Sequence, residues 1–303
     1  MHNALRPSLH FRHFLLALQF FTRVPVTGRL ANWVGYSPEM LRASAGHFPG
    51  IGWLVGGVAA GVFGLTWYVL TLAGHSSQAS AWVAAVLSTI TTVLMTGGFH
   101  EDGLADVADG LGGSLQRERA LVIMKDSRVG AFGVLALVLV LALKFALLVL
   151  LTGQSIQGDL RGVTTAVVVP LIAGHVLSRF APLWLIRWLP HVGDDATSKS
   201  KPLADQISAG AMGVAFLWSI PAIALACIAL GAIKTVVSSA MLLLALTWMY
   251  RWFRHRLQGF TGDCLGATQQ VGELAFYLGL AIAPAVSPAV LQAFSQSFLA
   301  VAR

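Results

Sequence analysis

Residues 130–152 read GAFGVLALVLVLALKFALLVLLT and contain one charged side chain, Lys144. A helix of about 20 residues crosses the roughly 30 Å hydrocarbon core of a membrane, so this run is long enough to span one. The bilayer interior offers no water to backbone amides, and the segment must therefore be helical. Similar runs along the chain predict an all-α, polytopic membrane helix bundle of about seven spans, at residues 51–73, 80–99, 130–152, 162–186, 209–230, 235–250 and 274–299.

The composition indicates the same class of protein. Of 303 residues, 56% are apolar and 11% are charged, and the mean hydropathy is +0.73, whereas a soluble domain has about 25% charged residues. The 20 Lys and Arg residues are scattered over many loops and form no continuous stripe for nucleic acid. Cys227 and Cys264 predict neither a disulfide framework nor a cysteine metal site. No repeat or linker divides the chain, so we expect one membrane-embedded domain over residues 1–303.

Positive charges in the loops predict the orientation of the spans. Cytoplasmic loops carry an excess of Lys and Arg, and with the amino end inside, 15 of the 20 cations lie on the cytoplasmic side and 3 on the other. Residues 11–21 are too short to span and predict a helix at the membrane surface. We therefore expect a multi-pass protein of the cytoplasmic (inner) membrane. Its active site should face the cytoplasm, because most carboxylates fall in the loops at 100–129, 187–208 and 251–273.

The first of these loops carries a dense acidic cluster. Four of the 13 acidic residues fall within the nine positions from Glu101 to Asp109. If residues 99–111 are helical, Asp102, Asp106 and Asp109 share one face while Glu101 points elsewhere. Like charges on one face repel, and a Mg²⁺ ion bound by these hard oxygen ligands would offset the repulsion. The pattern predicts a Mg²⁺ site, and the alternative is a solvated acidic face.

Residues 124–130, MKDSRVG, place two cations and a hydroxyl directly before a span. Arg128 can grip phosphate oxygens as a fork and Lys125 can act as a point charge, with Ser127 between them. Anchoring at the membrane surface explains the two cations equally well. Acidic Mg²⁺ ligands beside phosphate-binding cations are, however, the equipment of phosphoryl transfer.

A third segment, residues 259–267, reads GFTGDCLGA and lies in the loop at 251–273. Thr261, Gly262 and Asp263 form a pattern that is common in turns. The predicted topology nevertheless places Asp263 on the same side of the membrane as the acidic cluster. We therefore expect Asp263 to complete the metal site together with Asp106.

Two ionisable residues fall inside predicted spans, Lys144 and Arg179. A charge at that depth costs at least a few kcal/mol, so such a residue normally faces the bundle interior and has a partner. Arg179 lies near the cytoplasmic end of its span, and snorkelling to the surface is an alternative for it. For Lys144 the alternatives are a structural ion pair, the orientation of a ligating carboxylate, or contact with an anionic substrate.

The order and spacing of these motifs resemble those of the cobalamin synthases, also called adenosylcobinamide-GDP ribazoletransferases. The resemblance extends from the amino end of the chain to the last span. It rests on FTRVP at 21–25, FPGIG at 48–52, GGFHEDGLADVADG at 97–110, MKDSRVG at 124–130, LKFAL at 143–147 and TGDCLGA at 261–267.

The resemblance implies the last assembly step of the cobamide pathway. In that step a hydroxyl of α-ribazole, or of α-ribazole 5′-phosphate, attacks the phosphorus nearest the cobinamide in adenosylcobinamide-GDP. GMP leaves, and adenosylcobalamin or its 5′-phosphate forms. The resemblance also implies a Mg²⁺ requirement, these small-molecule substrates as partners, and contact with membrane lipid; whether the protein forms a homo-oligomer is left open.

Each candidate residue has an expected role in this reaction. We expect Asp102, Asp106, Asp109 and Asp263 to hold Mg²⁺, and one of them to take the proton of the attacking hydroxyl. Lys125 and Arg128 would neutralise the diphosphate, and Lys144 would orient a carboxylate or phosphate. The motifs of the resemblance supply the residues expected to bind substrate, which are Arg23, His100, Ser127, Thr261 and Gly262.

Two other functions compete with this hypothesis. A CDP-alcohol phosphotransferase also places spaced Asp-Gly carboxylates at a membrane surface, but its usual pattern has Ala-Arg after the first Asp-Gly, whereas here Ala105 is followed by Asp106. An ion-coupled transporter could use Lys144 and Arg179 along a pathway. It would require interrupted spans in two related halves, and the sequence shows none.

Overall fold

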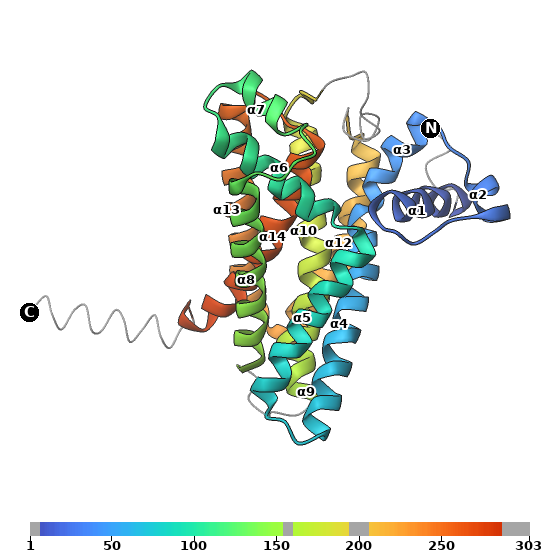
Figure 1. Cartoon of the computed structure of the whole chain (residues 1–303). Coiled ribbons are helices and arrows are strands. Elements are labelled where there is room, and N and C mark those ends of the chain that lie inside the picture. The colour runs from blue at the N-terminus through green and yellow to red at the C-terminus, as the bar shows by residue number, and fades with distance from the viewer. Residues whose placement is uncertain (1–6, 154–159, 194–205, 287–303) are drawn as a thin grey trace, which may run out of the picture.

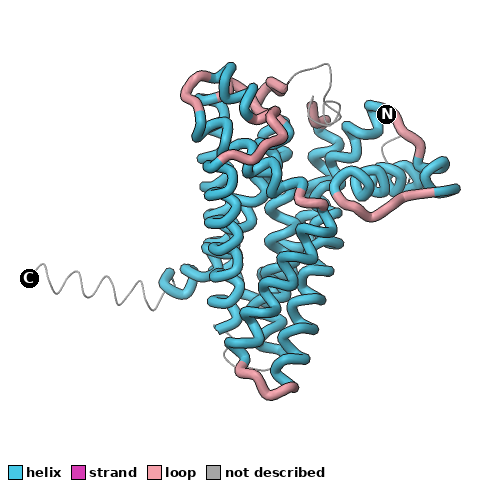
Figure 2. The backbone as a smooth tube through the Cα atoms, viewed as in Figure 1, coloured by secondary structure: helices cyan, strands magenta, loops and turns pink. Residues whose placement is uncertain are grey.

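The structure, a computed structural model, describes residues 7–153, 160–193 and 206–286. Long helices run side by side along one axis, and three short amino-terminal helices project sideways near one end of the bundle (Figure 1). Within these described ranges there is no β-strand, and the helices are joined mostly by short loops (Figure 2). The predicted all-α bundle is confirmed.

Six helices in the described residues are long and apolar enough to cross a membrane. They agree with the first six predicted spans. The sixth was predicted to be short, at residues 235–250, but its helix has 25 residues because it extends into the polar segment that ends at Arg256. The six helices are α4 (Phe48–Leu72), α5 (Ser77–Thr96), α8 (Ala131–Gly153), α10 (Val169–Trp188), α12 (Ala209–Leu230) and α13 (Ala232–Arg256).

The seventh long helix differs from the predicted span at residues 274–299. It is α14, which runs from Gly262 to Ile282 and so begins twelve residues before the predicted boundary. Hydropathy missed this start because the first half of α14 is polar, yet α14 packs against α6, α8, α10 and α13 and buries those polar side chains inside the bundle. Residues 287–299 of the predicted span lie outside the described residues.

Short elements surround these helices. The residues predicted to form a surface helix, 11–21, lie in α1, which packs against α3 and α4. The π-helical turn η2 leads directly into α10. The short elements are α1 (Pro7–Phe21), α2 (Gly28–Val34), α3 (Pro38–Ser44), η1 (Ala45–His47), α6 (Phe99–Gly113), α7 (Arg117–Ile123), α9 (Leu160–Val163), η2 (Thr164–Val168) and η3 (Ala283–Val286).

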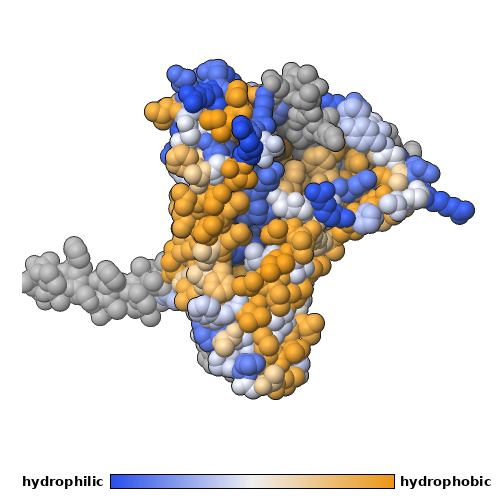
Figure 3. Space-filling view, in the orientation of Figure 1, coloured by the Kyte–Doolittle hydropathy of each residue, from blue (hydrophilic) through white to orange (hydrophobic). Residues whose placement is uncertain are grey.

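Apolar side chains cover the flanks of the bundle, and hydrophilic ones gather at the end that carries α6 and α7 (Figure 3). Exposed leucines on α8 and α13 illustrate the flank: Leu139 and Leu244 are 66% and 64% exposed. Such surface is stable against lipid and unstable against water. The polar end is where α6, the start of α14 and the end of α13 meet (Figure 1).

Candidate active site

The acidic cluster lies on α6, which begins after a sharp turn at the end of α5. Gly97 and Gly98 both have positive φ, 71° and 70°, a conformation that glycine adopts without strain. The turn redirects the chain across the polar end of the bundle. Glu101 and Asp102 then occupy the first turn of α6, where negative charge is favoured by the helix dipole.

The predicted division of the carboxylates is confirmed. Residues 99–111 are helical, so Asp102, Asp106 and Asp109 follow one another along one face of α6. Glu101 points the other way, and its Oε1 accepts a hydrogen bond of 3.0 Å from Nε2 of Gln270 in α14.

Helix α14 brings the second acidic segment to α6. A methyl group on Gly103 would stand 2.8 Å from the carbonyl oxygen of Asp263, and one on Gly266 would stand 3.2 Å from the carbonyl oxygen of His100. The two helices thus touch backbone to backbone through glycines. The expectation that Asp263 and Asp106 meet on one side of the bundle is confirmed, although 157 positions separate them in the chain.

The carboxylates repel one another strongly enough to alter their protonation. Burial and, after it, the negative charges of Asp263, Asp102 and Asp109 together raise the pKa of Asp106 from its ordinary 3.8 to about 7. Burial also raises the pKa of Asp263 to about 6; a hydrogen bond of 3.1 Å from Thr261 Oγ1 opposes that shift. The cluster therefore holds more negative charge than its own surroundings neutralise.

The carboxylate oxygens of the cluster do not converge tightly on one point. Among the described residues, one group of three or more His, Cys, Asp or Glu has ligand atoms all within 4.8 Å of one another, and that group is His10, His13 and His47, not the carboxylates. A cation held by the carboxylates would therefore take further oxygen ligands from water or substrate, as Mg²⁺ does at phosphate sites.

The Asp109 carboxylate is also hydrogen-bonded to the backbone of another helix. Its carboxylate accepts hydrogen bonds from the amide nitrogens of Gly130, at 2.7 Å, and Gly133, at 2.8 Å. These amides belong to the start of α8, where helix N–H groups lack partners within the helix. Asp109 thus caps α8 from α6, a role that the sequence analysis did not predict. Its predicted role as a metal ligand stays a prediction.

A cavity of about 490 Å³ lies beside the exposed Asp102. Arg23 lines it together with Thr22 and Thr96, and the Arg23 guanidinium packs against Gly97 at the turn into α6. The backbone N–H of Arg23 donates to Met95 O at 2.7 Å, which fixes this segment against α5. The structure therefore brings the predicted substrate-binding residue Arg23 to the acidic cluster.

The loop at 124–130 is exposed at Lys125, Ser127 and Arg128. Arg128 is paired with Asp126 through Nη2 and Oδ2 at 2.5 Å, and this pairing lowers the pKa of Asp126 to about 2. Because Arg128 is 87% exposed, the pair is held weakly and the guanidinium can exchange partners. The loop ends at Gly130, whose backbone N–H donates to Asp109, so this hydrogen bond connects the loop to α6.

The remaining predicted substrate residues lie between α6 and α14. Thr261 and Gly262 form the start of α14, and Gly262 lines a small apolar cavity together with His100. His100 is 2% exposed and stacks on Phe48 of α4 with ring centroids 5.7 Å apart. Burial lowers the pKa of His100 well below its usual value, so the ring is neutral.

Lys144 does not join the carboxylate cluster. It lies eleven residues beyond Gly133 along α8, about 16 Å of helix rise, and its Nζ pairs with Oε1 of Glu273 at 2.8 Å. Both side chains are buried, at 4% and 2% exposure. Of the alternatives left open for Lys144, the structure shows the ion pair. Glu273 itself lies in the middle of α14.

Glu273 is the centre of a buried polar network that the sequence analysis missed. It accepts hydrogen bonds from Gln269 Nε2 at 2.8 Å and Tyr277 Oη at 3.1 Å, and Oε2 lies 3.3 Å from His175 Nδ1. Arg179 donates to His175 and is 2% exposed, so it does not snorkel to the surface. Hydropathy gives no signal for Gln269, although its spacing of four residues from Glu273 on one helix does.

Arg256 in α13 and Arg117 in α7 connect the acidic helix α6 and the helix that follows it to the end of α13. Arg256 Nη2 donates to the carbonyls of Leu111 and Ser114 at the carboxyl end of α6, at 3.2 and 2.6 Å. Arg117 Nε donates to Leu257 O at 2.7 Å. Cations at a helix carboxyl end satisfy its free carbonyls and its dipole. These arginines therefore fix the acidic helix to the end of α13.

The amino-acid sequence is similar to those of known proteins over most of its length. The model of the family described as cobalamin-5-phosphate synthase matches residues 13–281. A protein of Polaromonas sp. (strain JS666 / ATCC BAA-500) named adenosylcobinamide-GDP ribazoletransferase is 61% identical over 280 residues, covering 91% of this chain and 98% of its own. Proteins of the same name from Albidiferax ferrireducens and Shewanella amazonensis are 57% and 44% identical, covering 91% and 88% of this chain and 99% and 94% of their own.

No solved structure matches the chain. The family match covers every predicted motif, from Phe21 in the first motif to Ala267 in the last. The carboxylate cluster and the helices that build it, α6 and α14, fall wholly within the matched residues apart from the last residue of α14. The chain belongs to the cobalamin-5-phosphate synthase family.

Proposed function

We propose that this protein joins adenosylcobinamide-GDP to α-ribazole, or to α-ribazole 5′-phosphate, and releases GMP. The curated relatives carry the name of this reaction, and the family description names a cobalamin 5-phosphate product. The observation that carries the proposal is the meeting of Asp102, Asp106 and Asp263 at the contact of α6 with α14. That cluster has the charge and the oxygen donors that transfer of a substituted phosphate requires.

The reaction needs an acceptor for one proton. The hydroxyl oxygen of the ribazole forms a bond to the phosphorus nearest the cobinamide, the bond from that phosphorus to the bridging oxygen breaks, and GMP leaves. The hydroxyl proton must go to a base. We assign this task to Asp106, because burial and the neighbouring carboxylates raise its pKa to about 7 in the metal-free protein, whereas an ordinary carboxylate is too weak a base. In this proposal Asp106 leaves the metal ion to the other carboxylates.

The donor set fits Mg²⁺. Asp102 and Asp263 offer hard carboxylate oxygens, and a cation between them would offset the burial and the neighbouring negative charges that raise the pKa of Asp106. When bound, Mg²⁺ would stabilise the charge that develops on the phosphate oxygens. Asp109 keeps its carboxylate on the α8 amides and adds a fixed negative charge near Asp106.

Cations near the cluster suit the diphosphate. Arg23 lines the same cavity as Asp102, and a guanidinium can bind two phosphate oxygens at once. Lys125 and Arg128 lie on the loop that leads to the Asp109 cap. In this proposal Arg23 binds the diphosphate in the cavity, and Arg128 leaves Asp126 to neutralise the leaving GMP.

We assign the protein to the cytoplasmic membrane, with the α6 end of the bundle in the cytoplasm. The six apolar helices support insertion in a membrane. The orientation rests on the charge asymmetry, since 15 of 20 cations fall on the side of the acidic cluster. Nucleotide substrates are made in the cytoplasm, which agrees with that orientation.

The test is release of GMP by purified protein. Protein in liposomes is incubated with Mg²⁺, adenosylcobinamide-GDP and either α-ribazole or α-ribazole 5′-phosphate, and GMP and the corrinoid product are separated and quantified. The Asp106→Asn variant should lose turnover by about a factor of 1,000, because the proposed base is lost. The matched control is Glu118→Gln, which removes an exposed carboxylate on α7 that is 81% exposed.

Absence of GMP release with both acceptors would overturn the proposal. A CDP-alcohol phosphotransferase would instead release CMP from a CDP-linked lipid precursor, and an ion-coupled transporter would perform no such chemistry. Near-normal turnover in Asp106→Asn, with the wild-type fold by circular dichroism, would remove Asp106 from the reaction and leave the family assignment standing.

A further inference from the structure

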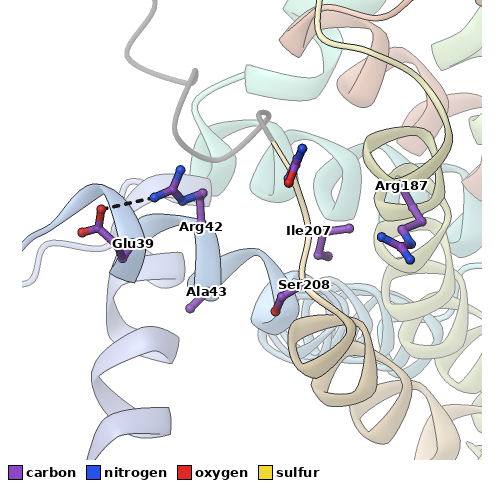
Figure 4. A pocket seen from close by; sticks show the side chains of 7 residues that line it. Glu39, Arg42, Ala43, Arg187, Ile207 and Ser208 are labelled. Carbon is purple, nitrogen blue, oxygen red and sulfur yellow. Dashed lines mark hydrogen bonds and ion pairs between the residues drawn. The ribbon is translucent and has the colours of Figure 1, made fainter.

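Two cavities lie side by side at the polar end of the bundle, away from the acidic cluster on α6. The first has a volume of about 640 Å³ and is lined by Arg42, Arg187, Glu39 and Ser208, among others. In Figure 4 Arg42 bonds Glu39 on one side, Arg187 lies on the other, and Ile207 and Ser208 lie between them. The lining contains two arginines and one glutamate, so the cavity has a net positive charge.

The second cavity has a volume of about 860 Å³ and shares Ala43 and Ser208 with the first. Its wall is mainly apolar and comes from the first turns of α12, including Val214, Phe216 and Leu217. Phe216 and Leu217 are 53% and 66% exposed, so the wall continues onto the flank of a membrane-crossing helix. A charged cavity thus adjoins an apolar one whose wall reaches the lipid-facing flank.

Backbone contacts and a helix cap hold the walls of both cavities in place. A methyl group on Gly46 would stand 2.5 Å from the carbonyl oxygen of Ala211, so η1 and the start of α12 are in direct backbone contact. Ser208 caps α12 by accepting a hydrogen bond of 3.1 Å from Ala211 N. The amino end of this 22-residue helix therefore points its dipole toward the shared rim, which favours an anion.

Three histidines, His10, His13 and His47, line the apolar cavity with ligand nitrogens within 4.8 Å of one another. A divalent metal would need a lone pair from each ring. Trp218, however, donates its indole N–H to Nδ1 of His47 at 3.1 Å. The neutral ring then carries its proton on Nε2, so neither nitrogen of His47 can bind a metal while this hydrogen bond is made. The three rings pack against one another as part of the cavity wall, and with His47 engaged by Trp218 they do not form a metal site.

We infer that the paired cavities bind one anionic phospholipid. The headgroup phosphate lies between Arg42 and Arg187, and the glycerol and acyl chains follow the apolar cavity onto the face of α12. The position suits this occupant, because the cavities lie where the candidate spans Pro38–Leu72 and Ala209–Leu230 begin, and the ends of membrane-spanning helices lie near the lipid headgroups. A lipid with one net negative charge balances the two arginines and Glu39, whereas a choline headgroup adds a cation beside the arginines.

The experiment is native mass spectrometry of the full-length protein in detergent, titrated with phosphatidylglycerol and with phosphatidylcholine of the same acyl chains. We expect one tightly held phosphatidylglycerol per chain and preference over phosphatidylcholine by about tenfold. Each arginine near an anionic lipid contributes about a fivefold effect, so Arg42→Gln/Arg187→Gln should weaken phosphatidylglycerol binding by about 25-fold. The control is Arg254→Gln, an exposed arginine in the last turn of α13.

A second variant tests the apolar cavity without touching a charge. Gly213 lines that cavity, and no atom lies within 4 Å of a Cβ built on it. Gly213→Leu should therefore fill the cavity and displace phosphatidylglycerol while the protein stays folded. Equal binding of both lipids, or unchanged phosphatidylglycerol binding in both variants, would overturn the proposal.

Two further experiments test whether the cavities bind another phosphate compound or a metal ion instead of a phospholipid. Inorganic phosphate and α-ribazole 5′-phosphate are each added in competition with phosphatidylglycerol, and we expect neither to displace it. Displacement by α-ribazole 5′-phosphate, with a raised KM for it in Arg42→Gln/Arg187→Gln, would make the cavity a substrate site and overturn the lipid proposal. A stoichiometric zinc ion that excludes the lipid and is lost in His47→Ala would overturn it as well.

Discussion

Gly103 in α6 lies against the backbone of Asp263 in α14, and a methyl group on Gly103 would stand 3.0 Å from the Asp263 Cα. No side chain separates the two helices at this point. Asp106 follows one turn later on α6, so the glycine contact decides how near its carboxylate comes to that of Asp263. The electrostatics of the whole cluster depend on this spacing.

Gly103→Ala should therefore impair turnover without unfolding the protein. The added methyl forces α6 and α14 apart by a few tenths of an ångström, and misplacement of about 1 Å at a catalytic group can cost about 100-fold. We expect a 10- to 100-fold fall in the rate of GMP release. The matched control is Gly61→Ala on α4, where no atom lies within 4 Å of the new methyl. Wild-type turnover in Gly103→Ala would show that the contact does not set the geometry.

The raised pKa of Asp106, about 7, predicts how stability changes with pH. Between about pH 4 and pH 7 the folded protein binds more protons at Asp106 than the unfolded chain, whose carboxyl keeps its ordinary pKa of 3.8. This contribution to stability therefore falls as pH rises through the window, and Asp263, with a pKa of about 6, acts in the same direction. Buried neutral histidines such as His100 act in the opposite direction below about pH 6.5, so the measurement compares wild type with Asp106→Asn: in EDTA-treated protein the unfolding temperature of wild type should fall relative to that of Asp106→Asn from pH 5 to pH 8.

Mg²⁺ should reverse that loss, and more strongly at pH 8 than at pH 5, because protonated carboxylates bind it poorly. Sodium chloride of equal ionic strength controls for screening. Asp106→Asn should remove the Asp106 contribution to the pH dependence and weaken the effect of Mg²⁺. A difference in unfolding temperature between wild type and Asp106→Asn that stays constant from pH 5 to pH 8 in metal-free protein would contradict the proposed repulsion.

The amino-acid sequence predicted the spans and the face of α6 because both follow from local periodicity. Six apolar runs became helices, and Asp102 and Asp106 share a face as their spacing requires. The meeting of Asp263 with Asp106 followed from loop charge alone, since both segments had to lie on one side of the bilayer. These inferences needed no knowledge of how the helices pack.

The partners of Lys144 and Asp109 could not be predicted from the sequence, because they depend on how the helices pack. Lys144 looked like a residue of the active site because nothing local identified its partner, Glu273, which is 129 positions away and sits in a helix whose polar start concealed its length. Asp109 looked identical to Asp106, yet only Asp109 meets the amides of Gly130 and Gly133. Such partners are set by the crossing of α6 with α8 and α14.

Asp109 and Asp106 should therefore respond in opposite ways to the same substitution. In Asp109→Asn the new amide turns a donor toward the N–H of Gly130 or Gly133, and an unsatisfied pair of this kind costs about 1–3 kcal/mol. In Asp106→Asn the loss of a repelled charge leaves stability unchanged or raises it. Thermal unfolding of the two variants in one detergent compares them directly. Equal stability would argue against the cap on α8.

The buried pair of Lys144 and Glu273 allows a double-mutant cycle that separates structure from catalysis. Lys144→Met leaves Glu273 charged and uncompensated inside the bundle, which costs about 3–5 kcal/mol. Glu273→Leu should cost a similar amount, and the double variant should recover most of the loss, although Gln269 and Tyr277 then lack their acceptor. Unfolding in detergent measures the coupling, and Mg²⁺ titration of the double variant measures the site. If the losses add without coupling, or if Mg²⁺ affinity falls in a stable Lys144→Met, then Lys144 serves the metal site and not the ion pair.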